Sequence, residues 1–162
     1  MQGGLFTYGL LGALAIALLV AAVTDLRRRQ IDNWLNAGIA AGAPVFWIAT
    51  SLSLGEIGFQ LAIALCALAV FAGLFALGLM GGGDVKLLVA LALWVKPLWF
   101  LQLIMVMAVA GGALTLVFGA WHLAQRRRDR AAIPYGIAIS GAALWVLASQ
   151  YLPLLQNDGL FG

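Results

Sequence analysis

The chain has 162 residues, of which 64% are hydrophobic and 9% are charged, whereas a soluble globular domain usually carries about 25% charged residues. This composition excludes a soluble globular protein and predicts a membrane protein. The formal charge of +3 does not indicate a nucleic-acid-binding protein, because most cationic residues form two short runs beside apolar segments, at 27–29 and 126–130. Such runs are typical of membrane topology signals and of contacts with anionic lipid.

Apolar segments fill most of the chain and predict transmembrane helices. A helix needs about 20 apolar residues to cross about 30 Å of hydrocarbon, and it satisfies its own backbone hydrogen bonds there. The predicted helices lie near residues 5–23, 35–53, 58–79, 84–96, 98–121 and 134–153. The connections are short and no internal repeat is visible. We therefore predict a single domain over residues 1–162, an all-α, polytopic membrane protein with six transmembrane helices in one bundle.

The first predicted helix, 5–23, is followed by Asp25 and by the arginines at 27–29. No Lys or Arg precedes the apolar stretch, so the segment differs from a secretory signal peptide and we expect an uncleaved span. Asp25 lies at the carboxyl end of a helix, where the helix dipole disfavours a negative charge. The arginines or solvent could neutralise it. The alternative is functional, because an ionisable group at membrane depth marks a site by default.

The third and fourth predicted helices, 58–79 and 84–96, are separated by a segment that contains three glycines before Asp84. An aspartate that opens a helix is a good N-cap, and glycines allow a flexible turn or close helix packing. The functional alternative is that Asp84 pairs with Asp25. Both residues lie near one membrane face, where a compact bundle could bring them together.

The fourth predicted helix is short, since its apolar stretch of about 12 residues rises only about 18 Å before Lys96 and Pro97. If it crosses, the connections after the first, third and fifth helices share a side that holds Lys86 and both arginine runs. If it turned back, the second arginine run would be exported, against the positive-inside rule. We therefore expect six crossings, with both termini outside and those three connections in the cytoplasm.

The remaining segments offer few other reactive side chains. The only histidine, His122, lies at the end of the fifth predicted helix, and the only cysteine, Cys66, lies within the third. No second imidazole or thiol is present to complete a zinc site or a Cys-His pair. We therefore predict that the chain uses no metal and no cofactor, which leaves the carboxylates to carry the chemistry.

Two neighbouring carboxylates can share one proton, because the charge of the first raises the pKa of the second. The ionised member takes a proton from water as the water attacks an amide carbonyl, and the protonated member supports the oxyanion and the leaving nitrogen. Asp25 and Asp84 thus predict aspartic-protease chemistry. The alternative is a small proton-coupled or cation transporter that uses the same two residues. A non-catalytic scaffold would use them only for packing and capping.

Three motifs resemble those of the type IV prepilin peptidase family, a group of intramembrane aspartic proteases. Gly81-Gly82-Gly83-Asp84, followed by Val85-Lys86, resembles the Gly-x-Gly-Asp signature of that family. The segment 25–33, Asp-Leu-Arg-Arg-Arg-Gln-Ile-Asp-Asn, is similar to the family's first aspartate motif. The segment 133–138, Ile-Pro-Tyr-Gly-Ile-Ala, resembles a third stretch that opens the last helix.

The resemblance implies an endopeptidase that removes the basic leader from type IV prepilins and pseudopilins at the cytoplasmic face of the bacterial inner membrane. Asp25 and Asp84 would be the catalytic pair. The glycines Gly81, Gly82 and Gly83 would form the active-site backbone. Lys86 would either position the site electrostatically or be an interfacial lysine whose ammonium group reaches toward water. The implied partners are the substrate peptide and membrane lipid, without nucleic acid, and both termini would be periplasmic. The oligomeric state is not indicated.

The chain departs from the family pattern in two places. Asp32 stands where the family often has proline; it suits a helix cap or a solvated position, and it is also a rival to Asp25 as catalytic partner. The connection at 25–33 has no room for the cytoplasmic zinc domain, with paired Cys-x-x-Cys motifs, of the larger members. The resemblance therefore does not extend to their second activity, methylation of the new N-terminus. The compact form is similar to the minimal peptidases of tight-adherence (Flp) pilus systems.

Overall fold

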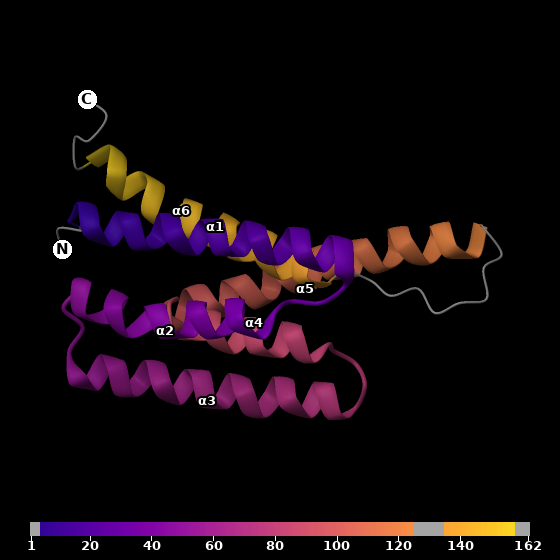
Figure 1. Ribbon diagram of the computed structural model, residues 1–162, viewed down its shortest axis with the longest axis horizontal. Helices are drawn as coiled ribbons and strands as arrows, with labels where there is room; N and C mark the ends of the chain where they lie inside the picture. The colour runs from indigo at the N-terminus through magenta and orange to yellow at the C-terminus, as the bar shows by residue number, and fades with distance from the viewer. Residues whose placement is uncertain (1–3, 125–134, 158–162) are drawn as a thin grey trace.

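The computed structural model describes residues 4–124 and 135–157 (Figure 1). Within these ranges the chain forms six α-helices. Their bounds are α1 Leu5–Arg28, α2 Asn33–Ala49, α3 Leu54–Ala76, α4 Gly82–Ala92, α5 Pro97–Ala124 and α6 Tyr135–Asn157. The predicted all-helical fold, with a helix at each of the six apolar segments, is confirmed. The second arginine run at 126–130 lies outside the described residues.

Three helices are long and apolar enough to cross a membrane, namely α1, α3 and the Pro97–Val117 part of α5. This agrees with the composition, and together they identify a membrane protein. The helix α2 has 17 residues, and α4 has 11, which rise only about 17 Å. The expectation that all six helices cross the membrane therefore stays a prediction.

The helix ends differ from the predicted ones because capping contacts decide them. The helix α3 begins at Leu54, four residues before the predicted start, because the Ser53 hydroxyl accepts from the Glu56 amide and the Glu56 carboxylate accepts from the Ser53 amide. This reciprocal pair is a capping box. The helix α1 continues to Arg28 and ends where Arg29 takes a left-handed conformation, φ 54°. Asp25 therefore lies within the last turn of α1.

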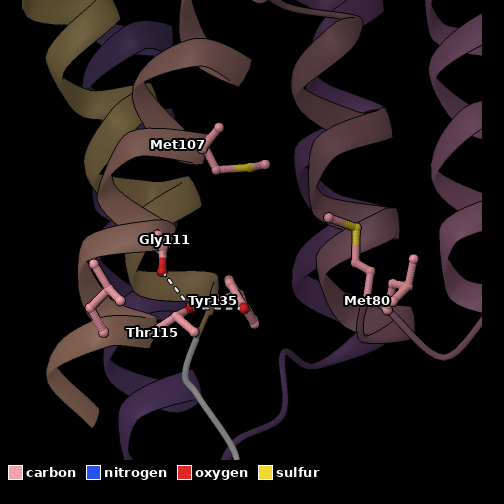
Figure 2. Close-up of a pocket in the computed structure, with 9 residues that line it drawn as sticks. Met80, Met107, Gly111, Thr115 and Tyr135 are labelled. Carbon is pink, nitrogen blue, oxygen red and sulfur yellow. Dashed lines mark hydrogen bonds between the residues drawn. The ribbon is translucent and has the colours of Figure 1, made fainter. Parts of the chain in front are cut away.

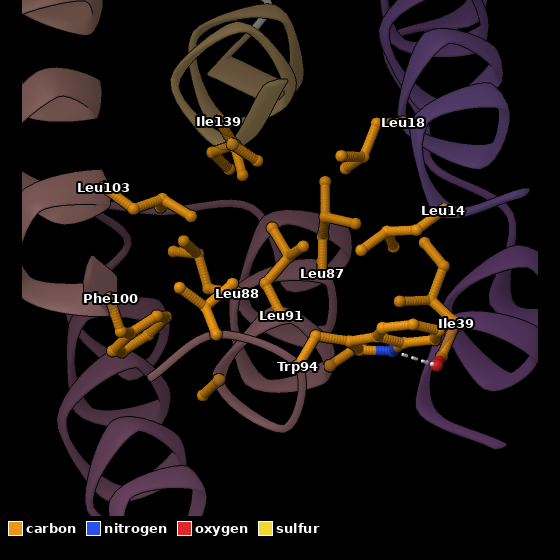
Figure 3. Close-up of a cluster of buried hydrophobic side chains, with 14 of the residues drawn as sticks. Leu14, Leu18, Ile39, Leu87, Leu88, Leu91, Trp94, Phe100, Leu103 and Ile139 are labelled. Atoms are coloured by element: carbon orange, nitrogen blue, oxygen red, sulfur yellow. Dashed lines mark hydrogen bonds between the residues drawn. The ribbon is translucent and has the colours of Figure 1, made fainter. Parts of the chain in front are cut away.

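The short helix α4 lies in the centre of the bundle and contacts α2, α3, α5 and α6. Leu87, Leu88 and Leu91 on α4 have no exposed surface. In Figure 3 they pack between the side chains of neighbouring helices, among them Leu18 of α1 and Ile139 of α6. Because lipid is as apolar as leucine, close packing rather than water exclusion stabilises these contacts in a membrane. The packing holds α4, and with it Asp84, inside the protein.

The carboxyl end of α4 and the turn that follows it are buried, and side chains of other helices donate to backbone carbonyl groups there. The Gln60 side-chain amide donates to the carbonyls of Ala92, at 2.8 Å, and Val95, at 2.6 Å. The Trp47 indole donates to the Leu93 carbonyl at 2.8 Å. The last carbonyls of any helix lack partners within the helix. These two side chains therefore allow α4 to end inside the bundle.

Replacing Gln60 with leucine is expected to lower the free energy of unfolding by about 1–3 kcal/mol, because buried carbonyls then lose their donor. Thermal unfolding in detergent measures the change. Gln102→Leu is the control, since Gln102 is half-buried and makes a longer hydrogen bond, 3.4 Å, with Gln150. Equal stability losses for both variants would contradict a capping role for Gln60.

The helices lie side by side along one direction, which gives the bundle two ends (Figure 1). The α1–α2 and α3–α4 connections lie at one end, and the amino end of α1 lies at the other. The carboxyl end of α1 and the amino end of α4 consequently come to the same end of the bundle. This arrangement positions both aspartates of the predicted pair.

Candidate active site

A cavity of about 350 Å³ opens at this end of the bundle, between the α1–α2 connection and the start of α4. It is lined by Asp25, Arg29, Gln30, Ile31, Asp32, Asn33, Gly81, Gly82, Gly83 and Asp84. Asp25 is 6% exposed and Asp84 is 8% exposed, and they lie close enough for the charge of one to act on the other. Two carboxylates that are 59 positions apart in the chain thus share one cavity.

Asp25 is held by the amino end of α6. Its Oδ2 atom accepts a hydrogen bond of 2.8 Å from the backbone N–H of Gly136, and the backbone of Ile137 also donates to the carboxylate. Both donors belong to the first turn of α6, where backbone N–H groups have no partner within the helix. The positive end of the α6 dipole therefore offsets the unfavourable position of Asp25 at the carboxyl end of its own helix.

Asp84 is the third residue of α4 rather than its N-cap. The N-cap position is taken by Gly81, with extended backbone (φ −74°, ψ 144°), so the interpretation of Asp84 as N-cap is wrong by three positions. The Asp84 carboxylate nevertheless accepts from the backbone N–H of Gly81. The carboxylates of both aspartates therefore lie at helix amino ends, that of Asp25 against α6 and that of Asp84 within the first turn of α4, and both accept backbone hydrogen bonds there.

Two glycines let the start of α4 pack closely against its neighbours. A Cβ atom at Gly83 would lie 3.3 Å from the Ile31 Cβ, and one at Gly82 would lie 3.3 Å from the ring of Phe75. These contacts are tighter than about nine in ten real Cβ contacts. The small residues thus bring the Asp84 end of α4 against the α1–α2 connection, which agrees with the close approach expected for the glycine motif.

Asn36 on α2 adds a polar contact behind the glycines that the sequence analysis did not single out. Its side-chain amide donates to the Gly83 carbonyl at 3.3 Å, and the side chain is buried. Its Oδ1 atom has no hydrogen-bond partner in the structure. A polar residue inside a predicted helix carries no spacing signal, so the sequence alone offered no reason to choose it.

Lys86 and Asp32 lie at the edge of the site. The Lys86 ammonium group donates to the Asn33 Oδ1 at 2.7 Å, which ties α4 to the start of α2. Asp32 occupies the N-cap position of α2 without a side-chain capping bond, although a capping role was one interpretation of it. Asp32 lines the same cavity as Asp25 and Asp84.

The other reactive residues lie apart from this cavity or cannot be placed. Cys66 is exposed on α3. The side chain of His122 and the whole of Asp129, the acidic residue within the run at 126–130, lie outside the described residues. Among residues that the structure does describe, no three Asp, Glu, His or Cys side chains are grouped closely enough to hold a metal ion. The chemistry available in the cavity is proton transfer between carboxylates, water and a bound substrate.

The fold and the cavity together define a helical membrane protein with a pair of buried carboxylates at one end of its bundle. The model of the type IV leader peptidase family matches residues 12–116, so the chain belongs to that family. The predicted family membership is confirmed. The matched segment contains both aspartates and the glycine motif, and it ends before the start of α6. Comparison with curated proteins and with solved structures gave no significant match.

Proposed function

We propose that the chain is an aspartic endopeptidase that removes the basic leader from prepilin-like and pseudopilin-like substrates. The observation that supports this proposal most strongly is the pair of buried carboxylates, Asp25 and Asp84, in one polar cavity of a type IV leader peptidase family member. Membership of this family supports the assignment of the chain as a peptidase. The pair supplies the groups that metal-free amide hydrolysis requires.

In the proposed mechanism the pair holds one proton. Asp25 carries the negative charge, because two backbone N–H groups of α6 donate to it, and Asp84 carries the proton. Asp25 takes a proton from water as the water oxygen bonds to the scissile carbonyl carbon. Asp84 donates its proton to the carbonyl oxygen, which gives a tetrahedral intermediate with two hydroxyl groups. The proton that Asp25 received passes to the leaving nitrogen as the C–N bond breaks, and one of the two hydroxyl groups returns a proton to Asp84 as the C=O bond re-forms. The products are a carboxylic acid and an amine.

The residues around the pair position the substrate and the carboxylates. Gly81 keeps extended backbone beside the pair, and Gly82 and Gly83 keep α4 close to its neighbours. Lys86 fixes the start of α2 through Asn33. None of these residues reacts in the proposed scheme. They hold the two aspartates in the geometry that a shared water molecule needs.

The charge distribution supports a cytoplasmic site in the bacterial inner membrane. Arg27, Arg28 and Arg29 lie at the cavity end of the bundle, and clustered arginines favour the cytoplasmic side. The amino end of α1 lies at the opposite end, which suits periplasmic termini. We also propose that α4 crosses the membrane within the bundle, because Gln60 and Trp47 satisfy carbonyls that would otherwise lack partners inside the protein.

The test is hydrolysis by the purified protein in liposomes, with a substrate that carries a basic leader followed by an apolar helix. Mass spectrometry of the products is expected to show a single cut between leader and helix. The double variant Asp25→Asn/Asp84→Asn is the control and is expected to leave the substrate intact. An inert wild-type protein would contradict the proposal. Proton or cation flux that depends on the same two aspartates would favour the transporter instead.

A further inference from the structure

A second cavity, of about 510 Å³, lies between α5 and the segment that leads into α4. We call it the α5 groove; its lining includes Met80, Met107, Gly111, Gly112, Thr115 and Tyr135. Figure 2 shows Met80 and Met107 on opposite sides of it. The lining is mostly apolar, and methionine side chains adapt to irregular apolar partners. The groove therefore suits an apolar occupant.

The polar groups of the α5 groove are already satisfied by one another. The Thr115 hydroxyl donates to the Gly111 carbonyl at 2.7 Å and lies 3.0 Å from the Tyr135 hydroxyl (Figure 2). A ligand that needs a hydrogen bond from either hydroxyl group would have to break one of these contacts. An apolar surface can enter without that cost.

The α5 groove adjoins the carboxylate cavity at one end. Met80 is followed directly by Gly81, which lines the carboxylate cavity. Tyr135 is followed directly by Gly136, whose N–H group binds Asp25. Away from the carboxylate cavity, the groove follows α5 from Leu116 back to Met107. These residues span about 14 Å along the helix at 1.5 Å per residue. The shape is that of a channel along a helix with a polar cavity at its mouth.

The wall formed by α5 has space for a second helix. Gly112 has no atom within 4 Å of the place where a Cβ would stand. Ala108 and Gly112 lie four residues apart and so lie on one side of α5. Small residues on one face let another membrane helix approach closely.

We propose that the α5 groove binds the apolar helix of the substrate, with the first residues of that helix between Met80 and Tyr135 and its following turns along α5 toward Met107. This inference rests on the proposed function and adds the site that recognises the substrate. The leader then enters the carboxylate cavity, and the bond between leader and helix lies at the junction beside Asp25 and Asp84. The enzyme thereby selects a polar segment joined to an apolar helix.

The first test fills the groove without disturbing the protein. Gly112→Leu places a side chain in open space on an exposed position, and leucine is a better helix former than glycine. Gly73→Leu on α3 is the matched control, because it is also exposed with no neighbouring atom within 4 Å but lies outside the groove. Gly112→Leu is expected to raise the KM for a substrate with its apolar helix about tenfold or more, and Gly73→Leu is expected to leave it unchanged.

The same kinetics on a short peptide that lacks the apolar helix distinguishes helix binding from damage to the carboxylates. The ratio of kcat/KM for the long substrate to kcat/KM for the short peptide is expected to fall in Gly112→Leu by the same factor by which KM for the long substrate rises. An unchanged preference would overturn the inference and assign the groove to lipid, while the proposed peptidase function would stand. If the wild-type protein cleaves neither substrate, the proposed function fails instead.

A cross-linking experiment tests the position of the helix directly and does not depend on turnover. In a Cys66→Ser, Asp84→Asn background, Met107→Cys is combined with single cysteines placed along the apolar helix of the substrate and exposed to a mild oxidant. Disulfides are expected at positions three to four residues apart, the spacing of one helix face. Leu68→Cys, on an exposed part of α3, is the control. Cross-links that form equally at both enzyme positions, or at neither, would overturn the inference.

Discussion

Asp25→Asn and Asp84→Asn are each expected to reduce kcat for leader removal by about 10³-fold or more, within the range that general acid–base groups contribute. An amide cannot accept the proton of the attacking water or donate one as a carboxylic acid does. The side-chain shape is kept, so both variants are expected to insert and fold. Their thermal unfolding in detergent is compared with that of the wild type to establish this.

The double variant sharpens this expectation. Because the two carboxylates act as one unit, removing both is expected to cost little more than removing either, as is typical of groups that share a catalytic step. If the fold-losses in kcat of the two single variants multiplied in the double variant, this would contradict a proton shared by the two carboxylates. The comparison uses initial rates for the same substrate and the same lipid composition.

Asp32→Asn is the matched control, since Asp32 lines the same cavity but stands at the start of α2. It is expected to change kcat by only a few-fold, because Asp32 is assigned no proton transfer. The alternative pairing, in which Asp32 replaces Asp25, predicts the reverse. A large loss in Asp32→Asn together with normal rates in Asp25→Asn would establish that alternative.

The helices were predictable from the sequence because apolar segments of sufficient length leave the backbone few other ways to satisfy its hydrogen bonds in lipid. Their ends were less predictable. The start of α3 depends on a capping box at Ser53 and Glu56, a local signal that an apolar count overlooks. The end of α1 depends on the left-handed conformation of Arg29, which no residue pattern indicates.

The aspartates Asp25 and Asp84 were identifiable because few charges occur near the apolar segments of this chain. Their surroundings were not identifiable. The hydrogen bond between Gly136 and Asp25 joins residues 111 positions apart, and Asn36 reaches Gly83 across 47 positions. Such contacts depend on how helices pack, which local patterns do not encode. The resemblance of residues 133–138 to a family motif was the one signal near Gly136, and it assigned that residue no role.

Gly136→Ala is expected to reduce kcat by about 100-fold or more, the loss that a misplacement of about 1 Å can cause. A Cβ atom at this position would lie 2.7 Å from the Asp25 Oδ2, 2.8 Å from its Cγ and 2.9 Å from its Cβ. The last of these atoms is fixed to the backbone of α1, so a side-chain rotation alone cannot relieve the contact. Either α6 moves away or Asp25 turns out of the pair.

Gly141→Ala is the control for this variant, because Gly141 lies on the same helix with no atom within 4 Å of its Cβ position. It is expected to keep normal kcat and to unfold at the same or a slightly higher temperature, since alanine favours a helix over glycine. For Gly136→Ala, we expect kcat to fall while KM for the full substrate changes little, because the α5 groove is left open. Normal turnover by Gly136→Ala would mean that Asp25 works without its fixed position against α6, and the role assigned to the first turn of that helix would then be wrong.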